Sequence, residues 1–161
     1  MRILIYERHL KPLPAHLFLQ SAHLCQQHHR PFNYLCLGIA DHGNTKVLFD
    51  TADKLGCQYI RDKELNHSQL PKAIERLQQF INNVDYLYVT VDLDVFSAAI
   101  APGVSAPAAK GITTEIFDEL FSVIKASNKI ALFDIAECNP EFDIDNHTSK
   151  LAAYLIYQFL F

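Results

Sequence analysis

The chain alternates between short β-forming runs and longer segments whose apolar residues recur at helical spacing. Strands separated by helices favour a parallel sheet with helices on both faces, and such strands are apolar along most of their length. The pattern predicts an α/β fold, with a three-layer α/β/α arrangement around a five-stranded parallel sheet. The expected strands span residues 2–6, 34–39, 58–60, 86–93 and 129–136.

Several of the intervening helical segments carry recognisable end signals. Gly56 follows one helical run and suits the left-handed conformation in which helices often end. Thr113 precedes another run, and Ser68 precedes a third, so we expect both side chains to act as N-caps. These signals divide the chain into helices of ordinary length.

Length and charge narrow the classes of function. The 161 residues, half of them apolar, predict one domain over residues 1–161. A net charge of −4 without runs of one sign argues against binding to nucleic acid or to a membrane surface. The sequence lacks a signal peptide and an apolar run long enough to span a membrane, so we expect a cytoplasmic protein with reduced cysteines.

A pair of acidic residues, Asp92 and Asp94, ends the most apolar of the expected strands. If the strand stays extended through both, their side chains point to the same side, about 6.6 Å apart. Such a pair either binds a cation, shares a proton or lies in water. The alternative is that one aspartate caps the following turn while the other is solvated.

A second acidic strand end follows the last expected strand. Asp134 and Glu137 lie there, and adjacent parallel strands would bring them to the same edge as the first pair. The irregular stretch 97–111 between the two strands is long for a compact domain, and loops of this kind often serve function. Asp143 and Asp145 are expected to serve the start of the last helix.

Two long blocks around these carboxylates carry a family resemblance. TVDLDVFSAAIAPGVSAPAAKGI and FDIAECNPEFDIDNHTSKLAAYLIYQFL resemble the C-terminal part of the ureohydrolases, the arginase and agmatinase superfamily, and are most similar to its formimidoylglutamase branch. Ser97 and Ala98 stand where the arginase branch has Asp-Pro. The resemblance implies half of an arginase-like fold, an N-terminally truncated domain, with strands in local order 5-4-1-2-3.

The resemblance also implies a chemistry. Ureohydrolases hold two manganese ions, and a hydroxide that bridges them attacks the carbon of an amidine-type substrate. Asp92 and Asp94 would then be metal ligands, since carboxylates suit manganese. Glu137 would face the cationic formimino or guanidino group and orient it.

The upstream metal motifs of the family are absent or altered. Gly-Gly-x-His does not occur, and at the place of Asp-x-His-x-Asp the chain has Glu7, His9 and Lys11. Glu7 and His9 remain candidate metal ligands, whereas an ammonium at Lys11 would repel a cation. No motif marks a nucleophilic serine or cysteine, and no catalytic residue is assigned.

The leading hypothesis is therefore a formimidoylglutamase-like domain, of histidine-degradation type, that hydrolyses a C–N bond of a linear amidine. Its manganese site would be incomplete and its activity impaired. A working hydrolase that uses Asp92, Asp94, Glu7 and His9 is a second hypothesis, and a non-enzymatic interaction or regulatory module with the same fold is a third. An apolar edge at residues 129–136 further predicts a homodimer.

Overall fold

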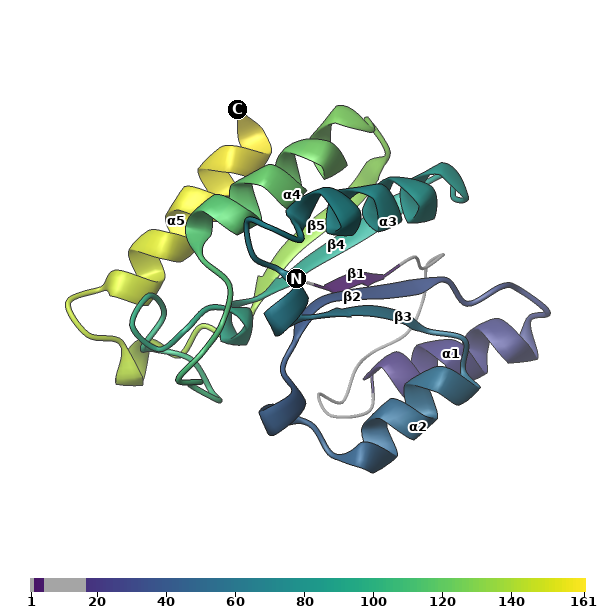
Figure 1. Cartoon of the computed structure of the whole chain (residues 1–161), viewed down its shortest axis with the longest axis horizontal. Coiled ribbons are helices and arrows are strands. Elements are labelled where there is room, and N and C mark those ends of the chain that lie inside the picture. Colours follow the sequence, from purple (N-terminus) through teal and green to yellow (C-terminus); the bar gives the residue numbers. More distant parts are fainter. Residues whose placement is uncertain (1, 5–16) are drawn as a thin grey trace.

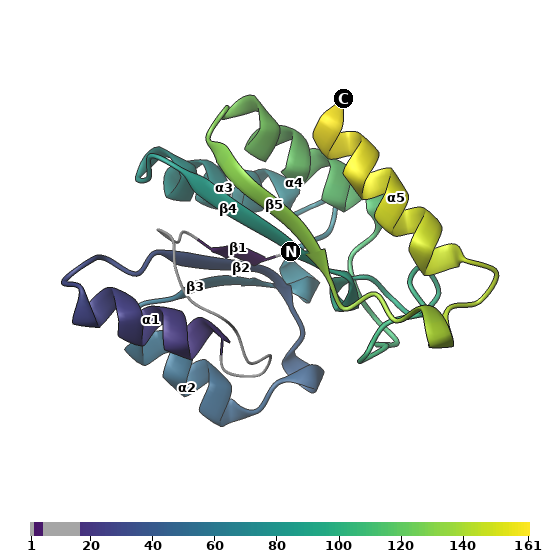
Figure 2. The ribbon, with the colours of Figure 1, turned by 180° about the vertical axis from the view of Figure 1, so that it is seen from behind.

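A computed structural model describes residues 2–4 and 17–161. Figure 1 shows a central sheet with α1 and α2 on one face and α3, α4 and α5 on the other, and Figure 2 shows the same layers from behind. The predicted three layers are confirmed. The helices are α1 (Leu17–Gln27), α2 (Lys46–Lys54), α3 (Leu70–Asn82), α4 (Thr114–Ala126) and α5 (His147–Leu160), and the strands are β1 (Arg2–Leu4), β2 (Tyr34–Ile39), β3 (Gln58–Arg61), β4 (Leu87–Asp92) and β5 (Ile130–Ala136).

The strands lie in the order β3-β2-β1-β4-β5, which is the predicted local order. The pairs β2–β3 and β4–β5 are parallel. The prediction of an all-parallel sheet is wrong at β1, which runs antiparallel to both of its neighbours. A strand of three residues makes few ladder hydrogen bonds in either direction, so the order of elements along the chain does not determine which way it runs.

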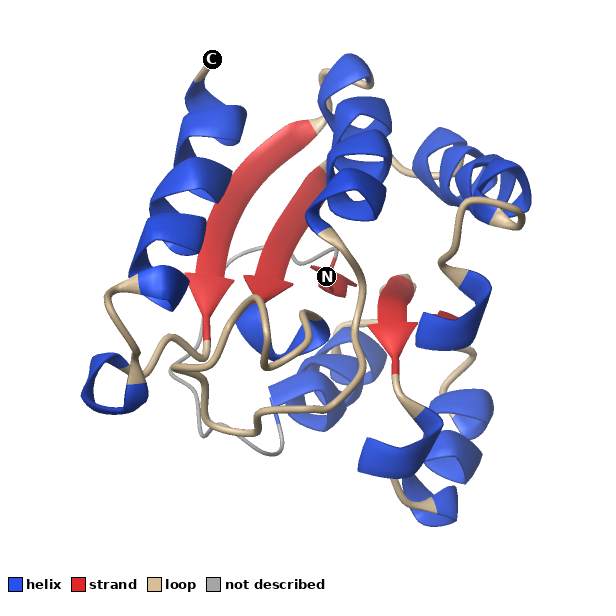
Figure 3. Ribbon diagram, turned by 60° about the vertical axis from the view of Figure 1, so that its left-hand side comes forward, coloured by secondary structure: helices blue, strands red, loops and turns tan. Residues whose placement is uncertain are grey.

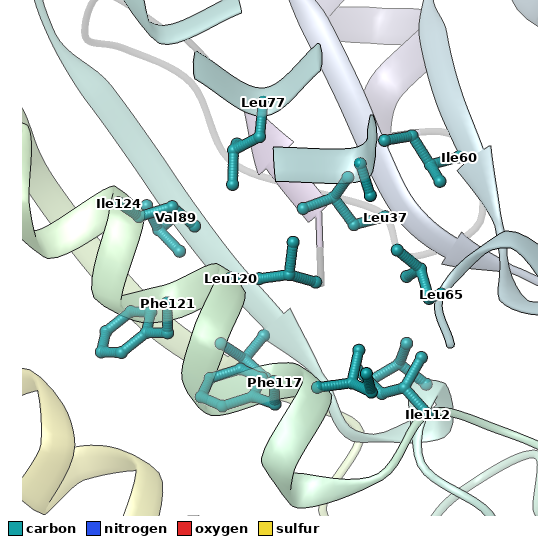
Figure 4. Close-up of a cluster of buried hydrophobic side chains, with 14 of the residues drawn as sticks. Leu37, Ile60, Leu65, Leu77, Val89, Ile112, Phe117, Leu120, Phe121 and Ile124 are labelled. Carbon is teal, nitrogen blue, oxygen red and sulfur yellow. The ribbon is translucent and has the colours of Figure 1, made fainter. Parts of the chain in front are cut away.

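The main hydrophobic core lies between the sheet and the layer formed by α3, α4 and α5. Leu77 of α3, Val89 of β4 and Leu120 of α4 are fully buried there, and Figure 4 shows their side chains converging. Phe133 of β5 stacks on Phe159 of α5 with ring centroids 4.5 Å apart. Alternate residues of β4 and β5 thus hold three helices on one face of the sheet.

The predicted helix ends are mostly confirmed. Gly56 adopts the left-handed conformation with φ of 70°, and the Thr113 side chain accepts a hydrogen bond from the amide of Ile116 at 3.4 Å. The prediction for Ser68 is wrong, because the side-chain oxygen of Asn66 takes the hydrogen bonds of the turn that leads into α3. An Asx turn two residues earlier competes with a serine cap for the same amides.

Two of the expectations concern membrane-spanning segments and the state of the cysteines. None of the helices in the described part of the chain is long and apolar enough to cross a membrane. All four cysteines are free thiols, and burial raises the pKa of the Cys57 thiol to about 11. Cys57 is therefore protonated at neutral pH and a poor nucleophile.

Candidate functional site

The first candidate carboxylate closes β4. Asp92 is the last residue of the strand and is only 7% exposed, and its Oδ1 accepts a hydrogen bond from the amide of Asp94 at 3.0 Å. Asp92 therefore caps the short 3₁₀ turn Leu93–Val95. The expected extended geometry for the pair is wrong, because the chain turns immediately after Asp92.

Asp94 lies within this turn and holds the long loop that follows. The amide of Ala106 donates to Asp94 Oδ1 at 3.3 Å, and the Ser105 hydroxyl lies 3.5 Å from Asp94 Oδ2. The loop is also anchored to the strand ends by a bridge between Phe96 and Ile112. The predicted functional stretch 97–111 is thus folded back onto the carboxyl end of β4, and Figure 3 shows it below the arrowheads of β4 and β5.

Glu137 comes from the end of β5 and meets Asp94 through Ser105. The Ser105 hydroxyl donates to Glu137 Oε2 at 2.5 Å, which is shorter than its approach to Asp94. A hydroxyl has one proton, so Ser105 donates it to Glu137, and its contact with Asp94 is longer and weaker. The structure thereby brings two of the predicted site residues, Asp94 and Glu137, to one serine.

The backbone at Glu137 has an uncommon conformation. Its φ is 68°, in the left-handed region that non-glycine residues rarely occupy. The neighbouring contacts hold it there: Val104 bridges to Cys138, and the amide of Asn139 donates to the Gly103 carbonyl at 2.8 Å. Backbone strain of this kind persists where surrounding contacts over-determine the position, often at functional sites.

Asp134 has a role that the sequence did not predict. It lies inside β5 opposite Thr90, and its carboxylate accepts hydrogen bonds from the hydroxyls of Tyr88 and, at 2.6 Å, Thr90. Burial, together with the hydrogen bond to Asp134, raises the pKa of Tyr88 above its usual value. Asp134 therefore links β4 to β5 and does not join Asp94 and Glu137 at the strand ends.

The other two candidate ligands, Glu7 and His9, lie outside the described residues. They follow the first strand along the chain, and the predicted parallel sheet would bring them to the end of β4 at which Asp92 and Asp94 lie. Leu4 instead pairs with Tyr34 and Tyr88, near the beginnings of β2 and β4. The described part of β1 therefore ends beside the beginnings of β2 and β4, whereas Asp92 lies at the far end of β4.

The described residues do not form a metal cage on their own. They contain no group of three or more histidine, cysteine, aspartate or glutamate side chains placed to hold a metal ion. Asp92 and Asp94 have the hard oxygen donors that manganese prefers, but Asp92 is engaged in capping a turn and Asp94 in holding a loop. Among the described residues, Asp92 and Asp94 are therefore not joined by a third side chain placed to hold a metal ion, and no catalytic step is assigned to a metal.

Ser105 is the residue of this site that sequence reasoning missed. It is separated from Asp94 by 11 positions and from Glu137 by 32, so no local spacing connects them. The cue available in the sequence was its position in the long irregular loop. Only the packing of that loop against the end of β5 shows which residue meets the carboxylates.

Comparison with known proteins gives the site a family context. Residues 14–161 match the model of the arginase family. The chain is 48% identical over 149 residues to the formimidoylglutamase of Vibrio cholerae and 47% identical over 146 residues to that of Photobacterium profundum. These matches cover 92% and 87% of the chain but 44% and 40% of those proteins, so the chain spans less than half of their length.

Solved structures agree with the sequence matches. The formimidoylglutamase of Bacillus subtilis superposes with a TM-score of 0.71 at 25% identity, covering 77% of this chain and 39% of that one. A Bacillus subtilis arginase superposes with the same TM-score of 0.71 at 22% identity, covering 78% of this chain and 46% of that one. The arginase-like α/β fold and the predicted resemblance are confirmed, and the chain belongs to the arginase family.

Proposed function

We propose that this chain is a formimidoylglutamase-like ureohydrolase domain whose manganese site is incomplete and whose hydrolytic activity is impaired. The substrate class is a linear amidine such as formimidoylglutamate, as in the relatives that carry this name. In this proposal Asp92 and Asp94 are the manganese ligands, and Glu137 orients the cationic amidine group. Glu7 and His9 are proposed as further, conditional ligands.

The observation that carries the proposal is the junction of Asp94 and Glu137 at Ser105. Two carboxylates from different strand ends converge on one hydroxyl, beside a backbone held in a strained conformation at Glu137. A carboxylate so placed suits an amidinium, which offers several N–H donors in one plane. Impairment is supported by the lack, among the described residues, of a third metal-binding side chain to join Asp92 and Asp94.

Manganese titration by calorimetry, with formimidoylglutamate turnover measured on the same sample, tests this proposal. We expect weak binding, with a Kd of roughly millimolar, and turnover at least about a hundredfold below that of the Vibrio cholerae relative. Asp92→Asn and Asp94→Asn should abolish the binding that remains. Asp50→Asn, which removes an exposed carboxylate on α2, is the matched control and should bind as the wild type does.

The opposite results have distinct meanings. Tight binding of two ions with rapid turnover would contradict impaired activity and favour the working hydrolase. The absence of binding at millimolar manganese would favour the non-enzymatic module. If Asp50→Asn lowers binding as much as Asp94→Asn, the residual binding is unspecific and the assigned ligands are wrong.

A further inference from the structure

Thr148 is a fully buried polar residue in the first turn of α5. Its side chain is 0% exposed, and its Oγ1 accepts a hydrogen bond from the amide of Gly103 at 2.8 Å. Gly103 belongs to the loop 97–111, which leads from β4 to α4, and Figure 1 shows this loop beside the beginning of α5. Because a buried hydroxyl and a buried amide both need a partner, this bond fixes where the loop lies against the helix.

Thr148 is itself held from the other side by Asp143. The amide of Thr148 donates to Asp143 Oδ1 at 2.9 Å, and the amide and hydroxyl of Ser149 donate to Asp143 Oδ2 at 2.9 Å and 2.8 Å. A β-branched side chain on a helix also has few rotamers available. Thr148 therefore presents its hydroxyl to Gly103 from a fixed backbone and in a restricted rotamer.

Gly103 lies next to the bridge that joins the two halves of the candidate site. Val104, the following residue, forms an antiparallel bridge with Cys138. Ser105 directly follows Val104 in the chain, and Glu137 directly precedes Cys138. The bridge therefore sets the distance over which the Ser105 hydroxyl reaches Glu137, and Gly103 adjoins one end of this bridge.

Backbone contacts at Gly103 leave the loop little room to move. Its carbonyl accepts a hydrogen bond from the amide of Asn139 at 2.8 Å. A Cβ atom added at this position would lie 2.7 Å from the Cβ of Asp143, so the loop is in close contact with the segment before α5. Glu137 keeps its φ of 68° within this packing. A left-handed backbone of this kind persists only while its surroundings hold it, so a loosened loop would let Glu137 relax away from Ser105.

We propose that Thr148 is a positioning residue of the candidate site. Through Gly103 it fixes the loop on which Ser105 lies, and the loop brings the Ser105 hydroxyl to Glu137. Thr148 itself does not touch the ligand in this proposal. The proposal rests on the proposed function, because the ligand whose binding depends on the contact of Ser105 with Glu137 is a linear amidine. The alternative is a threonine that contributes to folding alone.

Hydrogen exchange on the full wild-type chain, without ligand, is the first test. The amides of Gly103 and Asn139 donate to different acceptors, the Thr148 hydroxyl and the Gly103 carbonyl. If Thr148 holds this part of the loop, the two amides open together, and we expect their protection factors to agree within about fivefold. A wider difference would show that the two contacts open independently, and it would overturn the proposal.

Variants of Thr148 separate positioning from folding. Thr148→Val removes the hydroxyl and keeps the β-branched shape, and we expect roughly tenfold faster exchange of the Asn139 amide and a roughly threefold higher Kd for formimidoylglutamate. Thr148→Ser keeps the hydroxyl and should stay within about twofold of the wild type in both measurements. Thr90→Val is the matched control, because Thr90 is a buried threonine, 7% exposed, that donates to Asp134. It should lower stability in thermal unfolding and leave both measurements unchanged.

A double-mutant cycle shows whether Thr148 acts through Ser105. If it does, the chain with both Thr148→Val and Ser105→Ala binds formimidoylglutamate no more weakly than Ser105→Ala alone, because the contact that Thr148 supports is already lost. Additive losses of affinity would overturn the proposal, and so would a Thr148→Val variant that matches Thr90→Val in Asn139 exchange and in Kd. A wild-type chain that does not bind formimidoylglutamate would contradict the proposed function instead, and the exchange of Asn139 would then decide the role of Thr148.

Discussion

At the scale of single residues, Ser105 decides how the candidate site is arranged. Its hydroxyl lies between Glu137, to which it donates, and Asp94, which it approaches less closely. Without a group between them, two carboxylates repel and adopt other rotamers. Ser105 thus fixes the position of the Glu137 carboxylate relative to Asp94.

Replacement of Ser105 by alanine should weaken ligand binding more than folding. We expect Ser105→Ala to raise the Kd for formimidoylglutamate about fivefold, because the loss of a hydrogen bond to a charged acceptor costs about 1 kcal/mol or more. Calorimetry of ligand binding and thermal unfolding measure the two effects. Ser122→Ala removes an exposed hydroxyl that bonds to a helical carbonyl and is the control. Equal affinities of the two variants would contradict the role given to Ser105.

The predicted structural role of Asp143 at the start of the last helix is confirmed. The amides of Thr148 and Ser149 each donate to its carboxylate at 2.9 Å. Desolvation by itself would raise the pKa of Asp143, but these hydrogen bonds outweigh it and hold the pKa well below its usual value. Negative charge at the N-terminus of α5 is also favourable to the helix dipole.

The depressed pKa of Asp143 predicts a pH dependence of stability. A carboxyl whose pKa is lower in the folded state stabilises the protein above the unfolded pKa, near 4, and loses this effect as pH falls toward the folded pKa. We expect Asp143→Asn to be less stable than the wild type at pH 6, and the difference to shrink below about pH 4. Urea unfolding across this pH range measures it. A difference that stays constant with pH would contradict the assignment.

At the scale of elements, close backbone packing holds the loop after β4 against the segment between β5 and α5. Gly103 donates through its amide to the Thr148 hydroxyl at 2.8 Å, and its carbonyl accepts from Asn139. A Cβ atom at Gly103 would lie 2.6 Å from the Cα of Asp143, closer than real contacts allow. The position therefore requires glycine for the approach of one backbone to another.

Replacement of Gly103 by alanine should separate these loops. We expect Gly103→Ala to lower the free energy of unfolding by about 1–3 kcal/mol, as overpacked sites do, and to weaken ligand binding, because Ser105 lies two residues away. Chemical denaturation and calorimetry provide the measurements. Gly43→Ala is the control, since its added Cβ would meet nothing closer than 4.0 Å. A Gly103→Ala variant as stable as Gly43→Ala would show that the loops move apart without cost.

At the scale of the whole molecule, the described sheet lies between two layers of helices and carries the candidate site at the ends of its strands. Helices cover the two faces unequally, because α1 and α2 lie over one half of the sheet and α3, α4 and α5 over the opposite face (Figures 1 and 2). The candidate site lies at the carboxyl ends of β4 and β5.

The sequence by itself determined the layers, the order of the strands, most helix ends and the family. These features depend on local periodicity, on capping residues and on long blocks of residues that resemble a family, all of which are visible along the chain. Asp92, Asp94 and Glu137 were also evident, since each lies at or just beyond the end of an apolar strand. The sequence offered the capping of the following turn by one aspartate as an alternative, but it could not decide that Asp92 is the cap, because this geometry depends on where β4 ends.

Tertiary structure alone decided the rest. The direction of β1, the engagement of Asp134 with Tyr88 and Thr90, and the meeting of Asp94 with Glu137 at Ser105 all depend on contacts between residues far apart in sequence. Such contacts form only when strands and loops pack, and no local pattern encodes them.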